Sequence, residues 1–118
     1  MGNSMMAIRE LSETERTTAF GSITNAYVAI GTPFAHPSIK YVLQNQTDKP
    51  ISFSIDGVNS EITLAAGATF TSDVSTNKML GGGMCKAQGT QYYIKYISAP
   101  GSGAVYISTY YGANFDNL

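Results

Sequence analysis

The residues best suited to catalysis in this chain of 118 residues are a single histidine and a single cysteine. His36 lies between Pro33 and Pro37, and nothing near it in the sequence supplies the positioned nucleophile that a catalytic histidine needs. Cys85 precedes Lys86, a basic neighbour of the kind that reactive cysteines often have, but a cysteine in this context is more typical of a buried or half-buried core position. We therefore expect a loop histidine, a structural cysteine and no enzymatic activity.

The carboxylates Asp56, Glu61 and Asp73 border turns in the middle of the chain. The segment from Asp56 to Glu61 superficially resembles a calcium loop, but the acidic or amide residues that an EF-hand requires before its glycine are missing. Asp56 is therefore predicted to be a turn residue. A pair of these carboxylates that acts as in a glycosidase is an alternative that stays open, because the sequence does not give the distance between them in space. The chain has no tryptophan, the kind of large ring that carbohydrate sites favour.

Glycines 81–83 do not form a phosphate-binding loop, because no Lys-Ser or Lys-Thr follows at the required spacing. We expect a flexible loop there. No cluster of residues predicts a cofactor or a metal ion, since a lone cysteine excludes both a cysteine metal cluster and an internal disulfide.

The chain is unusually poor in charge. Charged residues make up 13% of it, against about 25% in an average globular domain, whereas hydrophobic residues make up an ordinary 43%. Low charge suits a subunit whose surface is covered by neighbours, because the cores of interfaces are depleted in charge. A net charge of −1 with scattered basic residues argues against sequence-specific nucleic-acid binding. The sequence predicts no membrane span and no secretion signal, so we expect synthesis in the cytoplasm.

The segment 51–70 gives the clearest structural signal. Ile51, Phe53 and Ile55 alternate with Ser52 and Ser54, which is the period of a strand with one apolar and one polar face. Turns at residues 56–57 and 66–67 separate this strand from a second, at 62–64, and a third that includes Phe70. We expect an antiparallel meander whose serine-rich face is exposed to water.

Further strands are predicted over residues 39–45, 91–97 and 104–111, with a short one at 85–87, a hairpin loop at 98–103 and an end at Gly112. About seven or eight short strands between Gly/Pro turns make an all-β antiparallel sandwich or jelly roll the predicted fold, as one domain over residues 18–118. Residues 1–17 lack a strand pattern. Ser12 and Glu15 have the spacing of a capping box, but no helical stripe follows, so we expect an extended arm that is ordered only by packing on another molecule.

The eight tyrosines carry the positive functional signal. Neighbouring residues of a strand point to opposite faces, and Lys95 cannot be buried unpaired without a large cost. The predicted inward residues are therefore Tyr92, Ile94 and Tyr96 on one strand and Val105, Ile107 and Thr109 on the last. The predicted outward residues are Tyr93, Lys95 and Ile97, then Tyr106, Ser108 and Tyr110. Because tyrosine is enriched at interfaces, we predict contacts with a neighbour at Tyr93, Tyr106 or Tyr110. Cross-strand tyrosine ladders on a monomer are the alternative.

Several short motifs together resemble small structural proteins of tailed-bacteriophage virions. They cover roughly residues 18–112 and are Ala19-Phe20-Gly21-Ser22-Ile23, Gly31-Thr32-Pro33, Asn45-Gln46-Thr47, Ile51-Ser52-Phe53-Ser54-Ile55-Asp56-Gly57, Leu64-Ala65-Ala66-Gly67 and Gly89-Thr90-Gln91-Tyr92-Tyr93-Ile94-Lys95. The resemblance implies a β-sandwich subunit that assembles in many copies, without catalysis, at the head-to-tail junction, in the tail or on the capsid surface.

The sequence and the resemblance together predict a virion protein whose partners are its own copies and other virion proteins, such as portal, tail or capsid subunits. A ring in the neck or tail is the leading expectation, and capsid decoration is the close variant. The alternative from another class is a carbohydrate- or receptor-binding β-sandwich, for which outward tyrosines would be ligand platforms.

Overall fold

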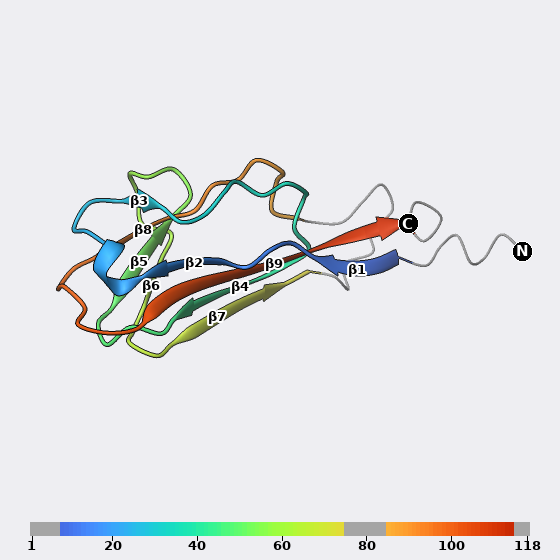
Figure 1. Cartoon of the computed structure of the whole chain (residues 1–118). Coiled ribbons are helices and arrows are strands. Elements are labelled where there is room, and N and C mark those ends of the chain that lie inside the picture. The colour runs from blue at the N-terminus through green and yellow to red at the C-terminus, as the bar shows by residue number, and fades with distance from the viewer. Residues whose placement is uncertain (1–7, 75–84, 115–118) are drawn as a thin grey trace, which may run out of the picture.

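The computed structural model describes residues 8–74 and 85–114, which form two antiparallel sheets packed face to face (Figure 1). Sheet A contains β1 (Ile8–Ser12), β2 (Arg16–Ala19), β4 (Lys40–Asn45), β7 (Thr69–Asp73) and β9 (Ala104–Asn114). Sheet B contains β3 (Val28–Ala29), β5 (Ile51–Ser54), β6 (Ile62–Leu64) and β8 (Tyr93–Tyr96), and a 3₁₀ turn, η2, spans Phe20–Ser22. The predicted β-sandwich is confirmed, with nine strands in the described residues rather than seven or eight.

The core lies between the sheets and follows the alternation of the sequence. Its buried members are Ile23, Ile30, Phe34, Tyr41, Leu43, Ile51, Phe53, Leu64, Tyr92, Ile94, Val105 and Ile107. Full burial of one such side chain contributes about 1.5–3 kcal/mol. The predicted inward residues are confirmed, because Tyr92, Ile94, Val105, Ile107 and Thr109 are buried and Tyr96 packs against the core.

Strand β9 is the centre of sheet A. It pairs with β4 on one side, and β1 and β2 pair with successive parts of its other side. The predicted end of this strand at Gly112 is wrong, since β9 runs on to Asn114. The reason is that Gly112 lies opposite Glu10 of β1, so the ladder continues through the glycine.

The expectation for the N-terminal arm is wrong for residues 8–17. Strands β1 and β2 pair with β9 of the same chain, and Arg16 is buried. This segment lacks an apolar stripe because the buried position of β2 is occupied by the charged Arg16 rather than by an aliphatic residue. The expectation of no long helix agrees with these strands, and residues 13–15 after Ser12 form a non-helical connection to β2. Residues 1–7 lie outside the described residues.

The predicted meander is confirmed for its first two strands and wrong for the third. Strands β5 and β6 are neighbours in sheet B, but β7 pairs with β4 in sheet A. Asn45, fully buried at the end of β4, accounts for this change of sheet: its amide Nδ2 donates to the carbonyls of Lys49, Leu64 and Ala65 at 2.8, 3.0 and 3.1 Å. One side chain thereby holds two of the connections that cross between the sheets, β4 to β5 and β6 to β7.

The polar face predicted for β5 is not exposed to water. Ser52 and Ser54 are buried, whereas Ile55, expected in the core, is 45% exposed. Strand β5 is flanked by β6 and β8, and the larger Lys95 and Tyr93 lie opposite the two serines. The serine hydroxyls find partners in Thr63, at 2.9 Å, and Asp56, at 2.8 Å, which makes their burial tolerable. Ile55 lies beyond the end of the strand, in the turn.

Two predicted connections differ from the structure. Residues 98–103 are not a hairpin loop, because they lead from β8 in sheet B to β9 in sheet A. At its end Gly103 has φ of 89° and lies against the backbone of Gln46 and Thr47, where a side chain would not fit. The short strand predicted at 85–87 is a single bridge between Lys86 and Ser38. Glycines 81–83 lie outside the described residues.

Candidate functional site

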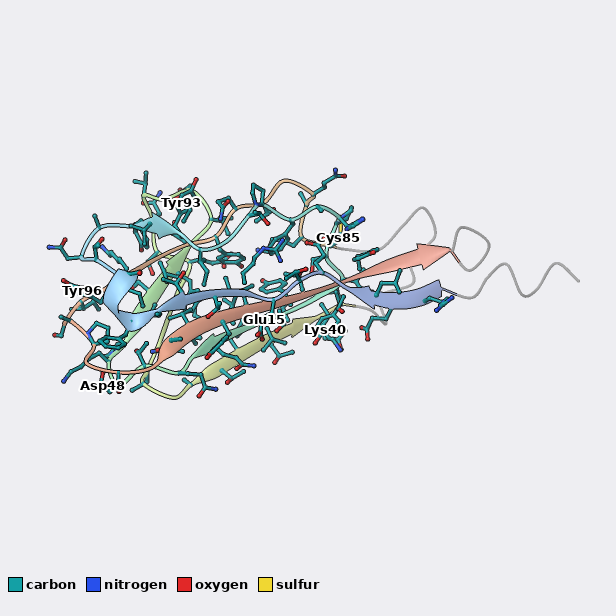
Figure 2. All side chains as sticks on the ribbon, viewed as in Figure 1. Glu15, Lys40, Asp48, Cys85, Tyr93 and Tyr96 are labelled. Carbon is teal, nitrogen blue, oxygen red and sulfur yellow. The ribbon has the colours of Figure 1, made fainter. Side chains whose placement is uncertain are left out.

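The three tyrosines predicted at an interface lie on both sides of the sandwich. Tyr106 and Tyr110 are half-buried on the outer face of sheet A, whereas Tyr93 is half-buried on sheet B, with its ring over Gly57. Figure 2 shows this separation, with Tyr93 on the side of sheet B and Lys40 on the side of sheet A. The structure therefore brings together two of the three residues.

We call the outer side of β4 and β9 the outer tyrosine face; it consists of Lys40, Val42, Gln44, Tyr106, Ser108 and Tyr110. The antiparallel register places Gln44 beside Tyr106, Val42 beside Ser108 and Lys40 beside Tyr110. All six side chains are half-buried. The result is a surface on which two aromatic rings are separated by uncharged groups.

Charge is confined to one end and one side of the outer tyrosine face. The Lys40 Nζ lies 4.4 Å from the centre of the Tyr110 ring and 3.4 Å from Glu10 Oε2. Glu15 accepts a hydrogen bond from the Ser108 hydroxyl at 3.2 Å. Exposed ion pairs of this kind contribute about 0–1 kcal/mol, so these contacts do little for the stability of the fold. The end that carries Tyr106 and Gln44 has no charged member.

A second cluster, which the sequence analysis did not find, joins the N-terminal strands to the loop that contains His36. The Glu13 carboxylate accepts hydrogen bonds from Arg16 Nη2 at 2.7 Å, from the backbone N–H of Ala35 and His36 at 3.2 and 2.9 Å, and lies 2.9 Å from His36 Nδ1. Burial raises the pKa of Glu13, but these hydrogen bonds and the Arg16 charge outweigh it and hold the pKa at about 2.

Arg16 is the structural centre of this Glu13 cluster. Besides Glu13, it donates to the carbonyls of Thr14, Thr32 and Pro33 at 3.4, 2.7 and 3.2 Å and to the Thr109 hydroxyl at 3.1 Å. Its guanidinium lies 5.0 Å from the centre of the Phe34 ring. The sequence shows the Glu13-Arg16 spacing, but only the fold reveals that the loop at 32–36 closes over it.

The predicted loop position of His36 agrees with the structure. The contacts of its ring were not predicted from the sequence. The ring stacks on Tyr111 with centroids 3.7 Å apart, and its Nδ1 faces Glu13. Both contacts hold the ring in place, so the cluster acts as a fixed support between β9 and the loop at 33–37.

The buried position predicted for Cys85 is wrong, since Cys85 is exposed. It borders a cavity of about 160 Å³ lined by Ser38, Ile39, Tyr41, Ser72, Val74, Cys85 and Lys86. The adjacent Lys86 pairs with Glu61 at 3.1 Å, and the Tyr92 hydroxyl donates to Glu61 at 2.7 Å. Burial lowers the pKa of Lys86, but its contact with Glu61 outweighs burial and raises it; burial and the same carboxylate raise the pKa of Tyr92.

The prediction for Asp56 is confirmed. Its Oδ1 accepts hydrogen bonds from the backbone N–H groups of Val58 and Asn59, both at 2.8 Å, and these bonds lower the pKa of the carboxyl. Within residues 8–74 and 85–114, no three histidine, cysteine, aspartate or glutamate side chains gather in a way that could hold a metal ion. In the same ranges no helix is long and apolar enough to cross a membrane.

Comparison of the chain with models of known protein families, with curated proteins and with solved structures gives no match. The site must therefore be interpreted from its own geometry. The outer tyrosine face is suited to contact with another protein surface, whereas the Glu13 cluster is saturated by internal partners.

Proposed function

We propose that the chain is a non-enzymatic structural subunit of a tailed-bacteriophage virion, assembled in several copies at the head-to-tail junction or in the tail. The observation that carries the proposal is the outer tyrosine face. Tyr106 and Tyr110 present half-buried rings on the same face of sheet A, and their hydroxyl groups have no hydrogen-bond partner in the part of the chain that the structure describes. Rings that combine apolar area with an available hydroxyl are typical of protein contacts.

The composition supports the same proposal. A charged fraction of 13% leaves a surface made largely of serine, threonine, asparagine and glutamine. Such a surface loses little hydration free energy when a neighbour covers it, because few charges have to be desolvated. The resemblance of the turn motifs to small virion proteins is the reason for proposing a phage virion as the assembly.

The test is to purify phage particles from cells that carry the gene and to measure the chain in them by quantitative mass spectrometry. A ring in the neck or tail predicts on the order of a dozen copies or fewer per particle, as a closed cyclic assembly requires. Hundreds of copies would indicate capsid decoration instead. A chain that stays in the soluble fraction, with none in purified particles, would overturn the proposal.

A carbohydrate- or receptor-binding module is the second candidate, because half-buried tyrosines on a β-sheet are also suited to stacking against sugar rings. A glycan array probed with the purified chain separates the two functions. Specific glycan binding that is lost in Tyr106→Ala would favour this second candidate.

A further inference from the structure

Strand β7 forms one edge of sheet A. It pairs with β4 on one side, and among the described residues no strand pairs with its other side (Figure 1). Thr69, Phe70 and Thr71 are exposed, with Phe70 at 36%. An edge of this kind presents backbone groups that another strand can pair with.

The hydrogen bonds to β4 show which backbone groups of β7 point outward. The N–H of Asn45 donates to the carbonyl of Ala68, and the N–H of Val74 donates to the carbonyl of Ile39, both at 2.9 Å. Bonded and non-bonded pairs alternate along an antiparallel ladder. Phe70 and Ser72 therefore bond to β4, whereas Thr69 and Thr71 direct their N–H and C=O groups away from the sheet.

The other edges of the sandwich carry the usual protections against pairing. Strands β3 and β6 have only two and three residues, and short edges resist the addition of a strand. The edge formed by β1 and β2 contains the charged Arg9 and Glu10 and is interrupted between Ser12 and Arg16. Strand β7 has five residues without a proline or a break, and its single charged residue, Asp73, is the last of them.

We propose that β7 pairs with β7 of a second copy of this chain, in an antiparallel two-fold contact centred on Thr71. The register of this β7 contact places Thr71 opposite Thr71 of the second copy, Thr69 opposite its Asp73 and Phe70 opposite its Ser72. No like charges face each other, which a self-complementary strand requires. The contact joins two copies of sheet A into one continuous sheet and covers Phe70.

The β7 contact rests on the proposed function in one respect: both require that copies of the chain assemble. Its occupant is a second copy rather than an unrelated peptide, because the strand is complementary to itself and needs no other sequence. The contact also leaves the outer tyrosine face open for other partners.

A cross-linking experiment tests the contact directly. Thr71→Cys is made in a Cys85→Ser background, since Cys85 is exposed and would form its own cross-links. A bonded antiparallel pair has Cα atoms about 5.5 Å apart, within the range that a disulfide spans. The control is Ala29→Cys, because Ala29 is also exposed and lies on β3, an edge strand of sheet B away from both β7 and the outer tyrosine face. A covalent dimer is expected from Thr71→Cys and not from Ala29→Cys. Equal cross-linking of both would overturn the contact.

Sedimentation of Thr71→Lys and Ala29→Lys gives a second readout that does not depend on oxidation. Two lysines opposite each other repel, so Thr71→Lys should raise the dissociation constant by up to about fivefold, whereas Ala29→Lys should not change it. Unchanged urea midpoints show that both variants are folded. A wild-type chain that stays monomeric, or equal effects of both lysines, overturns the contact. If the chain is present in particles and Thr71→Lys does not affect its assembly, the β7 contact is overturned and the proposed function stands. If the chain forms the β7 dimer but is absent from particles, the proposed function is overturned and the β7 contact stands.

Discussion

The Glu13 cluster and the outer tyrosine face lie on sheet A and use their polar groups in opposite ways. In the cluster, every hydrogen bond of the Glu13 carboxylate goes to a group of the same chain, and Arg16 reaches five partners. On the outer tyrosine face, the hydroxyls of Tyr106 and Tyr110 have no partner within the described residues. The first region is complete without another molecule, and the second is not.

This difference shows where to look for function in the chain. The residue types that usually carry catalysis, a histidine beside a carboxylate, are here fixed between strands and a loop by partly buried hydrogen bonds. The residue types that usually fill cores, large rings, are partly left on the surface. Changes in the Glu13 cluster should therefore alter stability and spare assembly, and changes on the outer tyrosine face should do the opposite.

The largest expected effect comes from Arg16→Ala. It leaves the Glu13 carboxylate, 9% exposed, without its cation, and the loss of one partner of a buried ion pair costs about 3–5 kcal/mol. Urea denaturation should show a fall of about 3 kcal/mol in the free energy of unfolding. The control is Arg9→Ala, since Arg9 is exposed on β1 and should change stability by less than about 0.5 kcal/mol. A loss below about 1 kcal/mol in Arg16→Ala would mean that the cluster does not hold the strands.

The second effect is a dependence of stability on pH. The Glu13 carboxyl titrates near 4.5 without its partners and at about 2 in the folded chain. Its contribution is complete above pH 4.5 and is lost as the pH falls from there toward 2, because the unfolded chain then binds the proton more readily. Glu13→Gln should flatten this part of the curve in urea denaturation, whereas Glu15→Gln should not. A wild-type curve with the same slope as Glu13→Gln would refute this assignment.

A smaller effect on stability, with a larger one on assembly, is expected from Tyr106→Ala and Tyr110→Ala. Half-buried side chains contribute little to the core, so each variant should lose about 1 kcal/mol or less. Sedimentation or incorporation into particles should be impaired in at least one of them, because a ring at the centre of a contact often contributes more than about 1 kcal/mol. Tyr93→Ala, on sheet B, serves as the comparison. Impairment by Tyr93→Ala alone would place the contact on the other sheet.

The smallest effect is expected from Ile97→Ser. Ile97 is 68% exposed next to β8, on the outer side of sheet B. A single exposed aliphatic residue needs no partner to explain it, so neither stability nor assembly should change by more than about 0.5 kcal/mol. Loss of assembly in Ile97→Ser would show that sheet B, and not sheet A, meets the neighbour.

The sequence predicted the parts of the fold that depend on alternation alone. The inward and outward residues of β8 and β9 follow directly from the period of two, because Lys95 fixes the outer face of β8. The change of sheet between β6 and β7 could not be predicted in this way, since alternation does not say which strand becomes the neighbour. That choice depends on Asn45, whose three carbonyl partners lie four to twenty residues away.

The candidate sites were predictable to different degrees. Val105, Ile107 and Thr109 alternate with Tyr106 and Tyr110 along the strand and point inward, so the outward positions of the two tyrosines could be predicted. The Glu13 cluster was missed because His36 lies 23 residues from Glu13 and reaches it only through the loop that follows Pro33. Glu13 and Arg16 lie in residues 12–18, a run without apolar residues, which gave no reason to expect burial.

Hydrogen exchange measured at low and at high protein concentration tests the central claim, that sheet A is the side through which copies meet. We expect slower exchange at high concentration for the amides of Thr69 and Thr71, which have no backbone partner within residues 8–74 and 85–114, and unchanged exchange in β5, β6 and β8. Exchange that is independent of concentration in β7, or protection that appears only in sheet B, would contradict the account.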